Sequence, residues 1–349
     1  MPLALSEPHG NMNGTRRTNR RHHSRGTLAG AMALLLLSSI GCGYVVRQGM
    51  IAYLKVRSEI TPNEIEIELE KSFVEKYKDR VGIAATFTVD ASAPGPAIRE
   101  IDGDLHFVGR APEIDLVAVA ELANADSYKA AVDRVHEADS TRKPVSITGV
   151  WRIWPEHAGH GTVQQGKPVL RPDTYRPDHV FEIHPVTRLD RISLLGSFTP
   201  VKGFSPGDAH DTFGIYERVP CKIVVTPATI SITTRKGLYN DVEFLLQLTD
   251  DPQHVVADGR FVLASALDMN GQVVAERVRM VFAKGTPPDQ AVRRLKPGDR
   301  LHVFGIPRVS FAELSRRVAV SASDPAQLSR TLPYEIVVLG VFAPGTGRS

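Results

Sequence analysis

The sequence has little cysteine: its 349 residues include only Cys42 and Cys221. Two cysteines rule out a disulfide framework, and no paired spacing of a structural zinc site is present. The chain also lacks a P-loop and the G-x-S-x-G elbow of the α/β-hydrolases. These absences leave no recognisable catalytic apparatus and favour a non-enzymatic role. Cys221, beside Ile223 and Val224, is expected in a buried strand.

Beyond residue 47 the chain has no large net charge of either sign. Residues 1–47 carry six arginines and one acid, Glu7, for a net charge of +5. The rest of the chain has 36 basic and 38 acidic residues, for a net charge of −2. A general nucleic-acid-binding protein needs a basic surface, because it must displace counterions from the phosphates. The charge therefore argues against nucleic acid as a partner.

One long uncharged run is present, over residues 27–46, and the basic segment RRTNRRHHSR precedes it. Twenty such residues suffice to span a bilayer as a helix, and the positive flank is expected to stay in the cytoplasm. The same pattern is typical of a signal peptide. We therefore predict a basic cytoplasmic tail over 1–26 and a transmembrane anchor or signal segment over 27–46. The protein would be a single-pass inner-membrane protein, with the bulk of the chain in the periplasm.

Two other fates of this segment stay open. Residues 39–42, Ser-Ile-Gly-Cys, approximate a lipobox, which would make Cys42 a lipidation site and the protein a lipoprotein. Cleavage near Gly41 would instead release a secreted protein. The apolar run continues past Cys42 to Val46, which favours the uncleaved anchor.

Beyond the anchor, apolar alternation predicts a mainly β chain with short helices, of the α+β class, in two small barrel-like domains of OB-like architecture. The predicted parts are a juxtamembrane helix over 47–79, a first barrel over 80–190, a linker over 191–214 and a second β-rich domain over 215–345. No convincing sequence repeat relates the two halves.

Several local patterns predict individual elements. Thr61 and Pro62 are typical of a helix start and predict a helix over 61–78, although the alternation of residues 65–69 would equally suit a strand. A second helix is expected over 114–137, and a polar loop over 155–177. Residues 260–282 are expected to form a hairpin that turns at Asn270-Gly271 as a type I′ turn.

The polar residues of two predicted strands form a candidate site. In the first strand Asp104 and His106 share one face, because strand side chains alternate; in the later strand Glu182 and His184 do the same. Carboxylate oxygens and imidazole nitrogens are suitable ligands for a divalent cation, and the same set could provide acid–base chemistry. Ordinary hydrogen bonding of a polar strand face is the favoured alternative. No other cofactor is indicated.

Other polar and aromatic residues give weaker signals. Glu121 falls in the predicted helix over 114–137, where a solvated side chain is expected. His157 and His160 fall in the predicted loop and are expected at the surface. Trp151 and Trp154 are expected on opposite sides of one strand, with at least one in the core.

The motifs together resemble a family of uncharacterised secreted bacterial proteins. The matching segments are DGDLH at 102–106, TGV at 148–150, the histidine-bearing loop, and EIHPV at 182–186. The resemblance covers about residues 80–190 and implies a compact β-barrel-like domain, with no activity attached. This chain departs from the pattern by a longer loop after Trp154 and by a whole second domain.

The sequence thus predicts a membrane-tethered cell-envelope protein that acts by binding or as a scaffold. Its partners would be the membrane, through the N-terminal segment, and an unidentified envelope protein or small ligand. One alternative is a metal-dependent hydrolase that uses Asp104, His106, Glu182 and His184. The other is a single-strand nucleic-acid-binding protein, since OB-like barrels often bind such strands.

Overall fold

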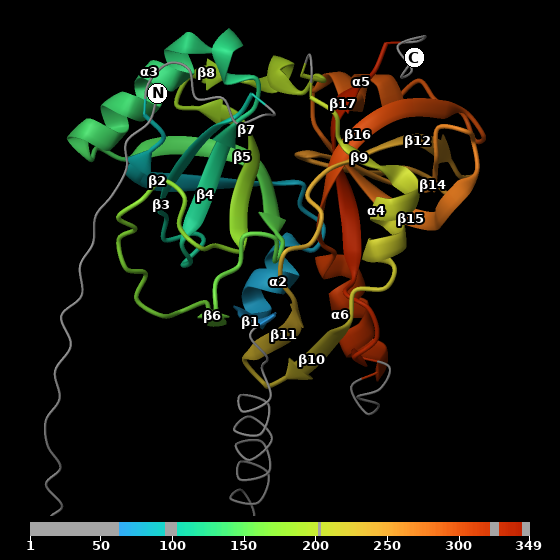
Figure 1. The fold of residues 1–349 in the computed structure, drawn as a ribbon, viewed down its shortest axis with the longest axis horizontal. Coiled ribbons are helices and arrows are strands. Elements are labelled where there is room, and N and C mark those ends of the chain that lie inside the picture. Colours follow the sequence, from blue (N-terminus) through green and yellow to red (C-terminus); the bar gives the residue numbers. More distant parts are fainter. Residues whose placement is uncertain (1–62, 95–102, 202–203, 322–327, 344–349) are drawn as a thin grey trace, which may run out of the picture. The chain divides into compact units, whose positions relative to one another are not determined.

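The computed structural model describes residues 63–94, 103–201, 204–321 and 328–343, which form a mainly β structure with few helices (Figure 1). Two of the three sheets each contain a closed barrel of five strands, and the third sheet has four strands. The predicted membrane segment and Cys42 lie outside the described residues. Within the described part of the chain, no helix is long and apolar enough to cross a bilayer.

The first barrel is built from five strands between residues 82 and 189. They are β2 (Gly82–Ser92), β3 (Leu105–Arg110), β4 (Ala118–Leu122), β5 (Val145–Ile153) and β7 (Phe181–Leu189). Strand β2 pairs with β3 and β5, and β3 pairs with β4. Strand β7 pairs with β5 and, in parallel, with β4, which closes the barrel. Helix α3 (Lys129–Thr141) connects β4 to β5.

The second barrel repeats this arrangement between residues 242 and 341. Its strands are β12 (Val242–Leu248), β14 (Gly259–Leu267), β15 (Val273–Ala283), β16 (Arg300–Val309) and β17 (Tyr334–Val341). Strand β12 pairs with β14 and β16, β14 pairs with β15, and β17 pairs with β16 and, in parallel, with β15. Helix α5 (Pro287–Val292) connects β15 to β16. The short strands β9 (Gly207–Asp208) and β13 (His254–Val256) extend the sheet at its edges.

The two barrels therefore share their strand order and the place of their helix. This confirms the prediction of a mainly β chain with two barrels, and the barrels are consistent with an OB-like architecture. Equivalent strands also carry similar residues: GVWR at 149–152 corresponds to GIPR at 305–308, and FEI at 181–183 corresponds to YEI at 334–336. The two halves are thus structural repeats, although the matching runs of sequence are only three or four residues long.

The repeated glycine has a steric reason in each barrel. A Cβ atom at Gly149 would lie 2.4 Å from the Ile183 side chain, and one at Gly305 would lie 2.4 Å from the carbonyl oxygen of Val337. Both glycines sit at a break in register with the following barrel strand. Each barrel therefore needs a residue without a side chain where its fourth and fifth strands approach most closely.

The four-stranded sheet corrects the predicted helix over 61–78. Its strands are β10 (Cys221–Val225), β11 (Thr229–Arg235), β1 (Glu64–Glu70) and β6 (Gly161–Gln164), in that spatial order. Within β1, Ile65, Ile67 and Leu69 are fully buried. The strand pairs with β11 on one edge and β6 on the other, and these pairings outweigh the local helix-start signal. Helix α2 (Lys71–Tyr77) begins only after the strand, so the juxtamembrane helix over 47–79 is wrong for residues 64–70.

The predicted helix over 114–137 is also wrong in its first half. Residues 118–122 form strand β4, in which every residue is buried. Apart from Glu121 the strand is apolar, and a short buried run of this kind cannot be distinguished from a buried helical turn by periodicity. The helix begins at Lys129. This correction moves Glu121 from an expected solvated helix face into a buried strand of the barrel.

Other connections differ from the predictions in detail. The predicted linker over 191–214 contains strand β8 (Ile192–Ser193), which pairs with β7, and the start of helix α4 (Ala209–Tyr216). The hairpin between β14 and β15 turns at the predicted place, but only Gly271 of the Asn-Gly pair has a positive φ, of 84°. The turn is therefore a five-residue loop rather than a type I′ turn.

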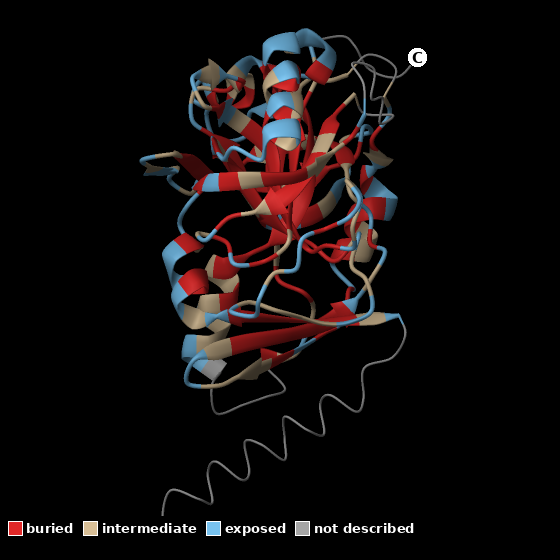
Figure 2. Ribbon diagram, turned by 90° about the vertical axis from the view of Figure 1, so that its left-hand side faces the viewer, coloured by how far each residue is buried: buried red, intermediate tan, exposed pale blue. Residues whose placement is uncertain are grey.

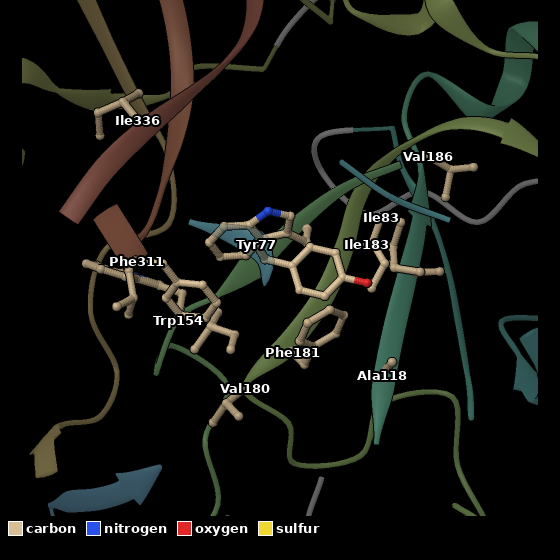
Figure 3. Close-up of a cluster of buried hydrophobic side chains, with 14 of the residues drawn as sticks. Tyr77, Ile83, Ala118, Trp154, Val180, Phe181, Ile183, Val186, Phe311 and Ile336 are labelled. Atoms are coloured by element: carbon tan, nitrogen blue, oxygen red, sulfur yellow. The ribbon is translucent and has the colours of Figure 1, made fainter. Parts of the chain in front are cut away.

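A continuous apolar core joins the elements (Figures 2 and 3). Figure 3 shows Tyr77 of α2, Phe181 of β7 and Phe311 of helix α6 (Phe311–Ser321) gathering in one part of it. Trp151 and Trp154 are both fully buried, so neither offers a stacking surface to a ligand. Cys221 is a buried free thiol, as predicted, and burial raises its pKa to about 11.

Two buried arginines connect the barrels through their fourth strands. Arg152 of β5 donates from Nε to the carbonyl oxygen of Pro307 (2.9 Å), and Arg308 of β16 donates from Nη1 to that of Trp151 (3.0 Å). Each arginine thus binds the residue that precedes the other, and the contact is reciprocal. Each also forms an ion pair within its own barrel: Arg152 with Glu182, and Arg308 with Glu335.

We predict that Arg308→Met destabilises the protein by about 3–5 kcal/mol, because it leaves the fully buried Glu335 without its principal cation. The double variant Arg308→Met/Glu335→Leu should recover much of the loss. The measurement is the free energy of unfolding from urea denaturation. Arg316→Met is a matched control, since its ion pair with Glu313 is exposed and contributes less than about 1 kcal/mol. Equal losses in the two single variants would contradict the prediction.

Candidate metal centre

Three side chains from neighbouring segments of the first barrel meet on its buried outer face, opposite the apolar side chains that fill the barrel. Asp104 directly precedes β3, Glu121 lies on β4 and His184 lies on β7. One potential ligand atom from each residue lies within 4.8 Å of the others, and all three side chains are buried. His184 is central: its Nε2 lies 3.3 Å from Asp104 Oδ2, and its Nδ1 lies 3.0 Å from Glu121 Oε2.

The strand registers explain why these residues meet. His106 of β3 is directly opposite Glu121 of β4, and its Nε2 lies 3.3 Å from Glu121 Oε2. On the other edge of β4, Ala120 pairs with Ile183 of β7. The next residues along these two parallel strands, Glu121 and His184, therefore project from neighbouring positions on the same face. This placement depends on the parallel pairing that closes the barrel.

The hydrogen bonding of His184 is incomplete. Its Nδ1 is buried and makes no well-aligned hydrogen bond, although Glu121 Oε2 and Glu182 Oε2 lie at 3.0 and 3.5 Å. Asp104 is oriented from the other side, since the backbone N–H of Asn124 donates to its Oδ1 (3.2 Å). Nδ1 of His184 thus lies close to two carboxylates without being aligned for a hydrogen bond to either. A metal-ligating nitrogen would have such surroundings.

Glu182 lies just outside the cluster of Asp104, Glu121 and His184, and its carboxylate contacts Arg152 and His179. Arg152 donates to its Oε2 from Nη1, and His179 Nε2 lies 3.3 Å from its Oε1. The other terminal nitrogen of Arg152 donates to Asn240 (2.7 Å) and Glu156 (3.2 Å). Glu182 therefore presents a second carboxylate to Nδ1 of His184, at 3.5 Å.

The buried charges shift the pKa values of the cluster. Burial alone would raise the pKa of Glu121, but the imidazoles of His106 and His184 lower it well below its usual range. Burial would likewise raise the pKa of Glu182, but Arg152 together with His179 and His184 lowers it well below its usual value. Burial would lower the pKa of His184, yet the carboxylates of Glu121, Asp104 and Glu182 raise it well above its usual value. A protonated imidazole therefore balances part of the negative charge of these carboxylates.

The structure brings all four predicted site residues into one network and adds two that the sequence analysis missed. Asp104 and His184 contact each other, His106 contacts Glu121, and Glu182 contacts His184. Glu121 was missed because β4 was predicted to be helical. Arg152 was not considered, although its recurrence in the GVWR and GIPR segments could have identified it.

The donor set fits a divalent transition metal. One imidazole and two carboxylates match the ligands of zinc and of other first-row ions, whereas calcium and magnesium prefer oxygen donors alone. Three protein ligands would leave at least one coordination position for a further ligand, as in open zinc sites.

The second barrel provides an internal comparison. Met280 of β15 pairs with Ile336 of β17, as Ala120 pairs with Ile183. The next residues are Val281 and Val337, so valines occupy the positions of Glu121 and His184. Phe261, which is opposite Val281, corresponds to His106. The same barrel therefore closes with an apolar cluster at this place, and the polar cluster is not a requirement of the fold.

An open cleft lies on the His106 side of the cluster. It is bounded by β3, β4 and the loop after β5, and it includes Glu156, His157 and His179. His157 stacks on His179 with ring centroids 5.1 Å apart, while His160 lies nearby in sequence within 3.1 Å of Lys236. Burial raises the pKa of Glu156 to about 7, against the opposing effect of Arg152.

Neither protein-family models nor curated proteins give a match to this chain. The resemblance of residues 80–190 to uncharacterised secreted proteins therefore stays a prediction, and the function has to be argued from the site itself.

We predict that the cluster makes stability depend on pH in protein kept metal-free by a chelator. A raised imidazole pKa stabilises the fold fully below about pH 6.5, the pKa of histidine in an unfolded chain, and this contribution is lost as the pH rises through the folded-state pKa. Above about pH 6.5 the free energy of unfolding of the wild type should fall by up to about 1.4 kcal/mol per pH unit, relative to that of the double variant Glu121→Val/His184→Val. Urea denaturation at several pH values measures this, and a difference that does not vary with pH would contradict it.

Proposed function

We propose that this chain is a membrane-tethered cell-envelope protein that binds a divalent metal ion on the buried outer face of its first barrel. The observation that carries the proposal is the buried cluster of Asp104, Glu121 and His184, whose donor atoms lie within 4.8 Å of one another. Burying two carboxylates is costly unless cations compensate them, and a divalent ion would do so directly.

The comparison between the barrels supports a functional rather than a structural role for the cluster. Because valines occupy the equivalent positions in the second barrel, a barrel of this order folds without any such group. An OB-like barrel that carries a polar cluster only in one of two copies has acquired it for chemistry or binding.

Binding is better supported than hydrolysis of a large substrate. The cavity that reaches Asp104 and His184 has a volume of about 30 Å³, which is room for about two water molecules. A substrate of ordinary size would not fit there. A role in binding the metal, with or without a very small ligand, agrees with this geometry.

The proposed localisation in the membrane rests on the uncharged run over 27–46 and the basic segment before it. Retention of the run as an anchor and lipidation at Cys42 predict different results. If the run is an uncleaved anchor, cells fed labelled palmitate should incorporate no label into this protein, and Cys42→Ser should stay in the membrane fraction. Label that is present in wild type and lost in Cys42→Ser would contradict the anchor and establish the lipoprotein.

Metal binding is tested on the full-length protein in detergent. After loading with zinc and desalting, we expect about one zinc per chain by elemental analysis. Glu121→Val/His184→Val should lose the metal and still fold, because it copies the residues of the second barrel.

A matched control is provided by His302, which forms a histidine–carboxylate pair with Glu243 (2.8 Å) outside the cluster. His302→Ala should keep the bound zinc. Substoichiometric zinc in wild type, or equal loss in both variants, would overturn the proposed site.

A further inference from the structure

The cavity beside the cluster separates the proposed metal ligands from the second barrel. Asp104 and His184 lie on its polar side together with Asn240 and Asp241, and Phe304, Ile306 and Leu339 of the second barrel contribute to its apolar side. All three apolar side chains are buried. A ligand that completes the coordination of the metal from this direction would therefore be enclosed between the two barrels.

A further polar group lines the same cavity. Ser197, in the 3-10 turn Leu195–Ser197, is buried, and its Oγ has no hydrogen-bond partner. An unsatisfied buried hydroxyl is costly, so a ligand that accepts a hydrogen bond from it would relieve that cost. Neighbouring Asn124 cannot take this role, because its side-chain amide already donates to the carbonyl oxygens of Ser197 (2.7 Å) and Thr199 (3.0 Å).

We propose that the cavity binds a water-sized ligand of the metal, either water or hydroxide or a triatomic monoanion, with Ser197 Oγ donating a hydrogen bond to it. This inference rests on the proposed metal site. The size limit follows from the cavity volume of about 30 Å³. The cation supplies the charge that a small anion requires in this buried place.

The test uses full-length protein loaded with Co²⁺, whose visible absorption reports the ligands around the ion. Azide is the small probe and benzoate the large one. We expect azide to change the cobalt spectrum saturably and benzoate to leave it unchanged. Ser197→Ala should keep the cobalt spectrum but weaken azide binding about three- to tenfold, through the loss of one hydrogen bond.

The size limit is tested by Ile306→Ala, which widens the cavity and should let benzoate change the spectrum. Ile232→Ala is the matched control, because Ile232 is equally buried but belongs to the four-stranded sheet. This inference would be overturned if azide did not change the cobalt spectrum, or if Ser197→Ala did not weaken azide binding. Either result would leave the metal site itself intact. Failure to bind cobalt at all would overturn the metal site as well.

Discussion

The reciprocal contact of Arg152 and Arg308 is the constraint on which the arrangement of the two barrels depends. Each guanidinium is fully buried, and each binds a glutamate of its own barrel and a backbone carbonyl of the other. A buried guanidinium is tolerated only when nearly all of its donors are satisfied. Arg308 meets this requirement with Glu335, with the carbonyls of Arg80, Val81 and Trp151, and with the face of the Trp151 ring. Neither barrel could satisfy its arginine alone.

The candidate metal centre is built on the same network. Arg152 fixes Glu182, and Glu182 faces Nδ1 of His184. The imidazole is thereby held toward Asp104 and Glu121 by a chain of contacts that begins at the second barrel. The position of the imidazole therefore depends on charged groups outside the three candidate ligands. It also explains why the cavity beside the cluster has walls from both barrels.

The repeated barrel separates what the fold needs from what the site needs. Both copies keep the glycine of the fourth strand, the buried arginine and the glutamate of the fifth strand. Only the first copy has Glu121 and His184, and the second has Val281 and Val337 instead. Since an apolar pair closes the second barrel, closure of a barrel of this kind does not require the polar pair.

The sequence by itself determined the elements whose signals are local. Alternation and turn residues were sufficient for the hairpin that turns at Gly271, for the strands that carry His106 and His184, and for a mainly β chain with two barrels. The same local patterns could not decide β4, because a short buried run is apolar in a strand and in a helix alike. They could not decide β1 either, where helix-start and strand patterns overlapped. Glu121 lies beside His184 only because β4 pairs with β7, and Arg152 lies beside Glu182 only because β5 pairs with β7. Both pairings join strands that are far apart in the chain. Those registers are set by how the barrel closes and packs, and this is a property of the tertiary structure alone.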